Sequence, residues 1–331
     1  AAPSPVLGQP RRFRKGLSYP APRRSVSQYR TLALFFVLAA VWGSAFVAIN
    51  AGLVYFPPVL FAAIRYDVAG VVMLGYAWLV ADDPLPRGRD EWTVVLVGAT
   101  LIIAAYHALL FVGESDPAVT SAVASVIVGL SPVLTTVFAR VLLPAERLTP
   151  LGVVGLLVGL VGAVVLAAPD PANLTAGGTV AKFLVLCAAT AFALGSVITR
   201  ALDTDLEIET MEAWAMLLGA GLMHLAAAAI GESPATIAWT TEAVLALGYL
   251  AVVASGAGYL LYFRLLDQLG PIEINLVSYV APVFAALSGW LVLGEGLESN
   301  TVAGFVLVCG GFAIVKRTAI RTELQRTGLL A

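Results

Sequence analysis

Residues 31–53 read TLALFFVLAAVWGSAFVAINAGL, an apolar run without a single Asp, Glu, Lys or Arg. About 20 apolar residues in a helix cross the ~30 Å hydrocarbon core of a bilayer, at about 1.5 Å per residue. The run is also longer than the apolar core of a removable signal peptide. We therefore expect it to be a membrane-spanning helix.

The rest of the chain has the same character. Of its 331 residues, 60% are hydrophobic and only 12% are charged, whereas a soluble domain carries roughly 25% charged residues. This composition cannot cover a water-facing surface, so lipid must be the outer solvent. We predict an all-α membrane protein with ten transmembrane helices, at about 31–53, 58–81, 92–113, 117–139, 149–168, 179–199, 210–230, 241–263, 271–293 and 300–315.

Basic residues alternate with these spans in a consistent way. If the amino terminus is cytoplasmic, seventeen of the nineteen Lys and Arg residues fall on the cytoplasmic side, as the positive-inside rule requires. The two exceptions are Arg65, inside the second span, and Lys182, near the outer end of the sixth. We expect a multi-pass protein of the plasma membrane with both termini in the cytoplasm.

The tails differ from the spans. Residues 1–30 hold seven basic residues, no acidic residue and several prolines, which predicts a disordered cytoplasmic tail held near anionic head groups. A nucleic-acid-binding arm is the alternative, but no aromatic or repetitive pattern favours it, and we expect no nucleic acid among the partners. Residues 317–331 form a second cytoplasmic tail. Cys187 and Cys309 lie in apolar runs without metal-ligand spacing, so we expect no disulfide, metal or cofactor.

The two halves of the chain resemble each other. Residues 132–162 read PVLTTVFARVLLPAERLTPLGVVGLLVGLVG, and residues 282–311 read PVFAALSGWLVLGEGLESNTVAGFVLVCGG. Each has Pro-Val, then a Glu, then two glycines seven residues apart. Chance similarity between two Gly-rich sequences is the alternative, but the shared order favours a repeat. Because five spans per repeat is an odd number, the second repeat must enter the membrane upside down, which is the geometry of alternating-access transporters.

The motifs resemble the drug/metabolite transporter superfamily, specifically its EamA-type members with two five-helix repeats. The residues that carry the resemblance are Trp42-Gly43-Ser44, Ala63-Ile64-Arg65-Tyr66, Ser131-Pro132-Val133 and Glu146-Arg147-Leu148 in the first repeat, and Leu269-Gly270-Pro271, Tyr279-Val280-Ala281-Pro282-Val283 and Leu293-Gly294-Glu295 in the second. Pro144-Ala145-Glu146 departs from the usual Gly before Glu, so the turn after the fourth span is expected to differ.

The resemblance implies a fold and an activity. It implies one repeat at residues 31–168 and an inverted one at 179–316, with spans five and ten at the periphery and a central cavity between the others. It also implies secondary transport of small metabolites, usually export.

Ionisable groups inside the spans are candidate site residues, because lipid makes them costly. Arg65, His107 and His224 lie at similar depths, ~9–11 Å from the outer helix ends at ~1.5 Å per residue. Arg65 is a candidate contact for a substrate carboxylate or phosphate; the alternative is a structural ion pair with Asp67, Glu114 or helix-end carbonyls. His107 is a candidate proton carrier or a satisfied interhelical hydrogen bond.

Other residues complete the candidate site. Asp67 is the second candidate for coupling transport to a proton. Pro132 and Pro282 occupy matching positions, and their missing hydrogen bonds make them candidate hinges. The remaining candidates for substrate binding are the aromatic and hydroxyl residues Trp42, Tyr106, Ser131, Tyr259, Ser278 and Tyr279. For each aromatic residue, simple packing is the alternative.

Two of the spans contain several glycines, which have no side chain. Gly152, Gly155, Gly159 and Gly162 lie in span five, and Gly304 and Gly311 in span ten. Small residues let helices approach closely, either within the chain or across a homodimer seam.

The sequence favours a secondary exporter of amino-acid-like or amphipathic compounds by alternating access, with proton coupling as one possibility. An importer of the same compounds is the first alternative. A membrane-embedded enzyme would need a catalytic motif, and no HExxH, GxSxG or Walker motif is present. A channel would not need inverted repeats.

The charge pattern predicts which loops face outward. Cysteines placed at Asp170 and Glu298 should react with an impermeant thiol reagent on intact cells, whereas a cysteine at Arg89 should not. Labelling at Arg89 together with no labelling at Asp170 would contradict the assigned orientation.

Overall fold

The structure is a computed structural model that describes residues 26–142, 150–167, 177–202, 204–269, 274, 277–315 and 317. The described residues form helices and contain no strand, which confirms the all-α prediction. Most of both predicted tails, the turn that contains Glu146 and the loop that contains Asp170 lie outside the described residues.

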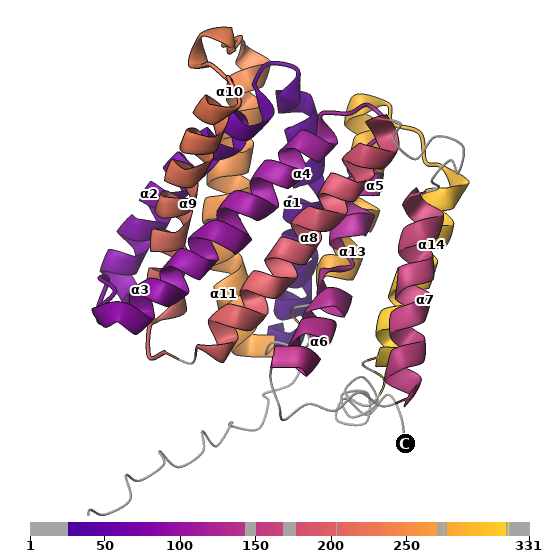
Figure 1. Cartoon of the computed structure of the whole chain (residues 1–331), viewed down its shortest axis with the longest axis horizontal. Coiled ribbons are helices and arrows are strands. Elements are labelled where there is room, and N and C mark those ends of the chain that lie inside the picture. The colour runs from indigo at the N-terminus through magenta and orange to yellow at the C-terminus, as the bar shows by residue number, and fades with distance from the viewer. Residues whose placement is uncertain are drawn as a thin grey trace, which may run out of the picture.

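The helices follow the predicted spans (Figure 1). The first half consists of α1 (Val26–Leu53), α2 (Pro58–Val80), α3 (Gly88–Val97), η1 (Gly98–Ala105), α4 (Tyr106–Glu114), α5 (Ser121–Val128), α6 (Ser131–Leu142) and α7 (Pro150–Ala167). The second half consists of α8 (Gly177–Ala201), α9 (Ile208–Ala229), η2 (Pro234–Thr236), α10 (Thr241–Gly248), η3 (Tyr249–Ala257), α11 (Gly258–Leu269), α13 (Val277–Ser288), η4 (Gly289–Leu293) and α14 (Ser299–Val315).

Within the described residues, seven helices are long and apolar enough to cross a membrane, and three shorter apolar helices occupy the predicted fifth, ninth and tenth spans. The helical membrane fold is therefore as predicted. One boundary differs: α1 begins at Val26, so the last residues of the predicted disordered tail are helical.

Two spans change their helical geometry midway. The third span joins α3, η1 and α4, and the eighth joins α10, η3 and α11, where η1 and η3 are π-helical. These are the third spans of their respective halves, so both repeats have the irregularity at matching places. π-helical turns are rare in proteins as a whole, and those that occur are often found at functional sites.

The bundle has two ends, which we call proximal and distal. The proximal end is where α1 begins, and there Thr31 donates to Gln268 at the end of α11. The distal end is where α1 finishes, and there the amide of Ala238 donates to the carbonyl of Tyr55. A Cβ on Gly178, at the start of α8, would lie 2.8 Å from Ala118 in the distal α4–α5 loop. Helices α1 and α8 therefore run in opposite directions, as inverted repeats require.

Helices α2 and α9 form a pair that is held at both ends. At the distal end, the carboxylate of Glu232, just after α9, accepts hydrogen bonds from the amides of Val59 and Leu60 in the first turn of α2, at 3.1 and 2.7 Å. A carboxylate is stabilised there by unpaired amides and the helix dipole.

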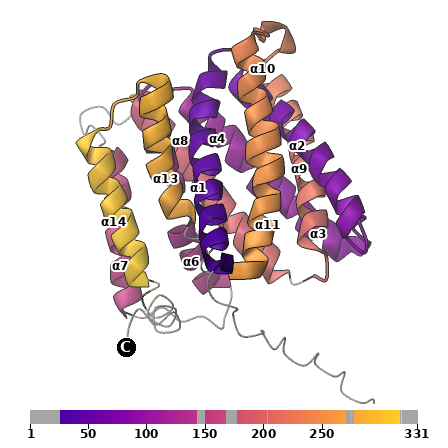
Figure 2. The ribbon, with the colours of Figure 1, turned by 180° about the vertical axis from the view of Figure 1, so that it is seen from behind.

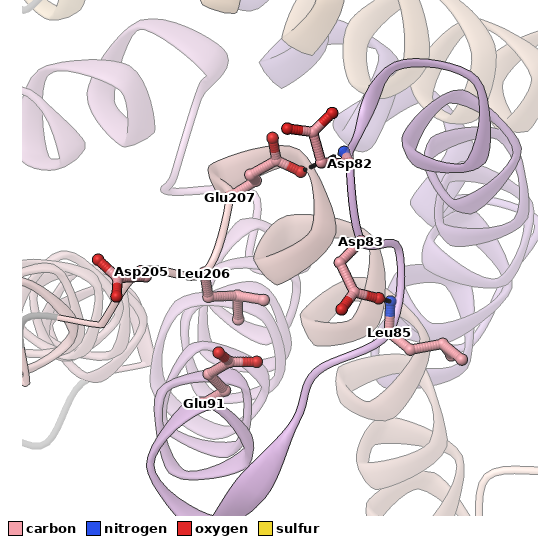
Figure 3. Close-up of a pocket in the computed structure, with 7 residues that line it drawn as sticks. All are labelled: Asp82, Asp83, Leu85, Glu91, Asp205, Leu206 and Glu207. Carbon is pink, nitrogen blue, oxygen red and sulfur yellow. Dashed lines mark hydrogen bonds between the residues drawn. The ribbon is translucent and has the colours of Figure 1, made fainter.

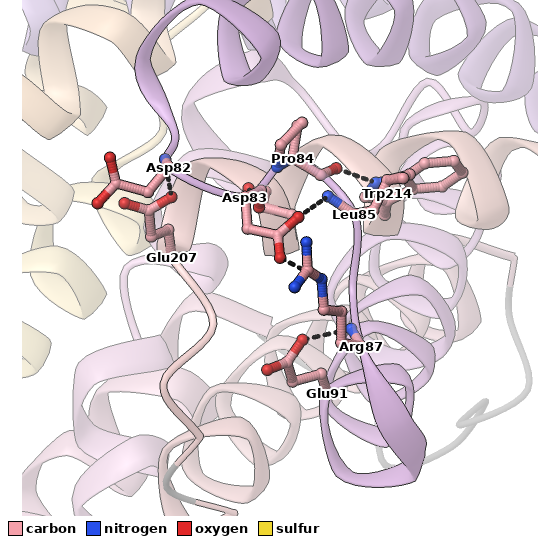
Figure 4. A network of polar contacts seen from close by, with 9 residues as sticks. Asp82, Asp83, Pro84, Leu85, Arg87, Glu91, Glu207 and Trp214 are labelled. Carbon is pink, nitrogen blue, oxygen red and sulfur yellow. Dashed lines mark hydrogen bonds and ion pairs between the residues drawn. The ribbon is translucent and has the colours of Figure 1, made fainter.

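At the proximal end, the α2–α3 loop contacts the start of α9 (Figure 4). The indole of Trp214 donates to the carbonyl of Pro84 at 2.9 Å, and Thr210 donates to the carbonyl of Asp83 at 3.2 Å. Glu207 accepts from the amide of Asp82 at 3.0 Å.

Helices α7 and α14 stand together at one edge of the bundle (Figures 1 and 2). A Cβ on Gly162 would lie 3.0 Å from the carbonyl oxygen of Gly304, and one on Gly311 would lie 2.6 Å from that of Gly155. These glycines thus pack α7 against α14 within the chain. Because that face is already used, a dimer would have to use the outer faces of the two helices.

The first and ninth spans approach each other closely at Gly43. A Cβ on Gly43 of α1 would lie only 2.4 Å from the carbonyl oxygen of Ala281 and 2.7 Å from Cβ of Phe284 on α13. Backbone atoms cannot move aside cheaply, so glycine is required for this approach.

We expect Gly43→Ala to destabilise the protein by about 1–3 kcal/mol, because the methyl group must push α1 and α13 apart. The midpoint of thermal unfolding in detergent is the measurement. Gly75→Ala is the matched control, since a Cβ at Gly75 meets no atom within 4 Å. Equal melting temperatures for the two variants would contradict the assigned packing.

Candidate functional site

A cavity of about 580 Å³ lies between the two halves of the bundle. It reaches the proximal end, where its wall includes the exposed Arg200 and Ile208, and it stops below the distal end at the buried Ile49 and Leu110. Its volume is in the usual range for small-molecule sites, ~300–1,000 Å³.

Most of the predicted site residues line this cavity. They are Trp42, Arg65, Tyr106, His107, Ser131, Pro132, Tyr259 and Ser278. Pro282 and Tyr279 are not in its wall; Tyr279 packs against Phe312 with the ring centroids 4.4 Å apart. The structure thus brings eight of the predicted residues together from six helices.

Arg65 is buried, with 6% of its surface exposed, and lies in the wall of the cavity. Its Nε donates to Oγ of Ser255 in η3 at 3.1 Å, and its guanidinium carbon lies 5.1 Å from the ring centroid of Tyr66. Within the described residues it forms no ion pair. The predicted alternative partners are used elsewhere, because Asp67 pairs with His224 and Glu114 accepts from Asn50.

His107 lies directly beyond η1 and joins two helices. One ring nitrogen, Nε2, lies 2.7 Å from the hydroxyl of Tyr66 on α2, and Nδ1 lies 2.9 Å from the carbonyl oxygen of Ile103. The imidazole is therefore hydrogen-bonded between helices while it also lines the cavity.

Aromatic rings line much of the cavity. Trp42 lies 6.0 Å from Tyr259 and 5.5 Å from Tyr262, measured between ring centroids. Its indole donates to the carbonyl of Ala254 in η3 at 3.1 Å, next to the Ser255 that accepts from Arg65. Tyr106 lies 5.3 Å from Phe192 and 4.4 Å from His107. The π-helical segment η3 thus holds Arg65 and Trp42, and η1 ends directly before Tyr106 and His107.

The sequence interpretation missed the acidic member of the site. Glu212 on α9 lines the cavity, and its Oε2 is buried without a hydrogen-bond partner among the described residues. Glu212 lies at the start of the predicted seventh span, 210–230. The available signal was that it lies inside the apolar run, three residues beyond Glu209. Arg200, Phe192 and Tyr262 were also missed.

Asp67 and His224 lie on the outer side of the α2–α9 pair. His224 Nε2 lies 2.7 Å from Oδ2 of Asp67, and 40% and 47% of the two side chains are exposed. Asp67 does not line the cavity. Of the two predicted coupling residues, only His107 does.

The fourth span is broken beside the cavity. Helix α5 ends at Val128, and α6 begins at Ser131, with Pro132 in its first turn, where proline costs no hydrogen bond. Ser131 donates to the carbonyl of Val128 at 2.7 Å, which satisfies one carbonyl at the break. In contrast, Pro282 lies inside α13. The two matching prolines therefore have different surroundings.

The distal end is sealed by rings and by polar groups. Phe56 and Phe61 stack with centroids 4.5 Å apart, and Phe61 meets Phe111 edge-on at 5.3 Å. Beside them, Asn50 donates to Glu114 and to Ser121, and Ser121 donates to Glu295. We call these four polar residues the distal cluster.

A second, smaller pocket of about 180 Å³ lies at the proximal end (Figure 3). Its wall contains five carboxylates, those of Asp82, Asp83, Glu91, Asp205 and Glu207. Arg87 forms an ion pair with Asp83, and its amide donates to Glu91 (Figure 4). In the described part of the chain, no group of three or more His, Cys, Asp or Glu side chains is placed to hold a metal ion.

Comparison with known proteins identifies the family to which this architecture belongs. The EamA-like transporter family matches residues 30–168 and, a second time, residues 179–317. The chain is 26% identical to the uncharacterized transporter YoaV of Bacillus subtilis (strain 168), over 82% of this chain and 91% of YoaV. It is 29% identical to the uncharacterized inner membrane transporter YedA of Escherichia coli (strain K12), over 81% of this chain and 83% of YedA.

A solved crystal structure has the same fold, with a TM-score of 0.63 and 22% identity over 89% of this chain and 99% of the other. The resemblance seen in the motifs is thus confirmed by both halves of the chain. The protein is a multi-pass membrane transporter rather than an enzyme, and it belongs to the EamA-like transporter family.

Proposed function

We propose that this transporter exports small amphipathic compounds of the amino-acid type by alternating access. The observation that carries the proposal is one cavity lined by aromatic rings together with a buried arginine and a half-buried glutamate whose Oε2 has no partner, neither in an ion pair within the described residues.

The two charges explain the substrate class. Buried charges are costly unless they are paired, and Arg65 and Glu212 would each gain an opposite charge from a zwitterion. A guanidinium binds a carboxylate through two parallel hydrogen bonds, and Glu212 is suited to an ammonium group. Arg65 and Glu212 both line the same cavity.

The aromatic wall explains the preference for an apolar side chain. Trp42, Tyr106, Phe192, Tyr259 and Tyr262 line the same cavity. Their ring faces attract apolar and aromatic groups, and also an ammonium group through its charge.

The shape of the cavity favours export. It reaches the proximal end, which the basic loops predict to be cytoplasmic, so a cytoplasmic substrate can enter this conformation. An importer would pass through the same conformation, and direction therefore needs its own test.

The roles of Arg65 and Glu212 can be tested separately with three ligands that share a phenyl ring. L-phenylalanine carries an ammonium and a carboxylate group, phenethylamine carries only the ammonium, and 3-phenylpropionate carries only the carboxylate. We expect L-phenylalanine to stabilise the purified protein most in a thermal-shift assay. Arg65→Lys should weaken L-phenylalanine and 3-phenylpropionate roughly tenfold or more, because an ammonium group cannot replace the bidentate fork. Glu212→Gln should instead weaken L-phenylalanine and phenethylamine.

The control is Arg264→Lys, an exposed arginine that is not in the wall of the cavity. It should change neither affinity nor melting temperature. Unchanged affinity but a lowered melting temperature in Arg65→Lys would show that Arg65 is a structural residue.

Direction is tested by flux. Right-side-out vesicles preloaded with labelled L-phenylalanine should lose it faster with the unchanged chain than with Arg65→Lys. Accumulation against a gradient into the same vesicles would show import instead.

A further inference from the structure

The distal cluster contains two carboxylates in one chain of hydrogen bonds. Asn50 on α1 donates through Nδ2 to Oε2 of Glu114 at 3.1 Å and to Oγ of Ser121 at 3.0 Å. Ser121 in turn donates to Oε1 of Glu295 through its hydroxyl at 2.8 Å, and its amide also donates to that carboxylate. One amide side chain and one serine therefore link Glu114 to Glu295.

The two carboxylates are satisfied to very different degrees. Glu295 accepts from a hydroxyl and from the first amide of α5, where the helix dipole also favours a negative charge. Glu114 is 2% exposed and accepts one hydrogen bond, while its Oε1 is buried and has no partner within the described residues. If Glu114 were ionised, its Oε1 would be a buried charged oxygen without a hydrogen-bond donor. A bound proton removes that charge.

The charged and titratable groups near Glu114 lie on α2, α4 and α8 and in the loops after α4 and η4. The like charge is Glu295, and the cation is Arg65 on α2, whose only hydrogen bond in the described chain goes to Ser255. Tyr106 and His107 lie on α4 itself, and Asp116 follows it. Lys182 lies near the distal end of α8. No ion pair of Glu114 is formed within the described residues.

We propose that Glu114 is a proton-binding site that controls the distal seal. The seal closes when Glu114 takes a proton from the solution at the distal end, and it opens when that proton returns to the same solution. The ionised form needs water, and only an open seal supplies it, so loss of the proton and opening are linked.

The proposal rests on alternating access in the proposed function but not on any substrate. It also differs from the coupling residues expected from the sequence. Asp67 is already paired with His224 outside the cavity, whereas Glu114 lies in the contact between α1, α4 and α5 that must separate for the distal end to open.

The first measurement is the infrared band of protonated carboxyl groups, compared between about pH 6 and about pH 9, a range above the titration of exposed carboxyls. We expect the unchanged protein to lose a band across this range that Glu114→Gln lacks, whereas any band from Glu212 should persist in Glu114→Gln and disappear in Glu212→Gln. Asp67→Asn, a matched carboxyl-to-amide change, should retain the Glu114 band. A difference spectrum without a Glu114-dependent band would overturn the proton site.

The second measurement reports the seal. In a chain with Cys187 and Cys309 changed to alanine, a cysteine replaces Val123, which is buried just beyond Ser121 and is not in the cavity wall. Its rate of reaction with a thiol reagent is divided by that of a cysteine at the exposed Ser115, which corrects for thiol ionisation. This ratio should rise severalfold with pH in the otherwise unchanged chain and stay flat in Glu114→Gln.

Glu295→Gln provides a second variant if Glu114→Gln folds poorly. Removing the neighbouring like charge should let Glu114 ionise more readily, so the seal should open, and the labelling should rise, at lower pH than in the unchanged chain. An identical pH response in all variants would overturn control of the seal by Glu114. Neither measurement uses a ligand, so failure of L-phenylalanine to bind would leave this test intact.

Discussion

Hydrocarbon offers a backbone amide or carbonyl no hydrogen-bond partner, and the structure depends on that constraint throughout. A span whose backbone groups are all paired within the segment is a helix. Two departures from regular helix contribute to the site. The break between α5 and α6 lies in the cavity wall and is partly satisfied by Ser131. In η3, a π-helical carbonyl accepts from Trp42, and a hydroxyl accepts from Arg65. At the site, therefore, side chains supply some of the hydrogen bonds that the backbone carbonyls need.

The same constraint explains what could be predicted from the sequence. Apolar runs and basic loops give the spans, because hydropathy and charge are properties of single segments. The depth of Arg65 and His107 followed from counting residues, and the structure brings both to one cavity. The partners of ionisable groups were not predictable in this way. Asp67 was expected to be a candidate for Arg65 or for a proton, yet the rotation of α2 against α9 turns it toward His224. Glu212 and Glu114 acquire their significance only from neighbours on other helices. The π-helical segments also left no recognisable pattern in hydropathy.

The two halves of the chain are similar in sequence order but not identical in conformation. Pro132 follows a break in its span, whereas Pro282 lies within a helix. Such asymmetry is what an inverted-repeat transporter needs, since exchange of the two conformations exchanges the open and sealed ends. The cavity that reaches the proximal end and the aromatic contacts at the distal end belong to one of these two states.

The pairing of α2 with α9 has a mechanical consequence. One helix comes from each repeat, and Glu232 holds the pair at the distal end while Trp214 and Thr210 hold it at the proximal end. A helix pair fastened at both ends moves as one rigid rod. Helices α7 and α14, again one from each repeat, are likewise packed glycine to glycine. In the proposed alternating-access cycle, the moving bodies would therefore not be the two sequence repeats. They would be composite units, each with helices from both halves of the chain.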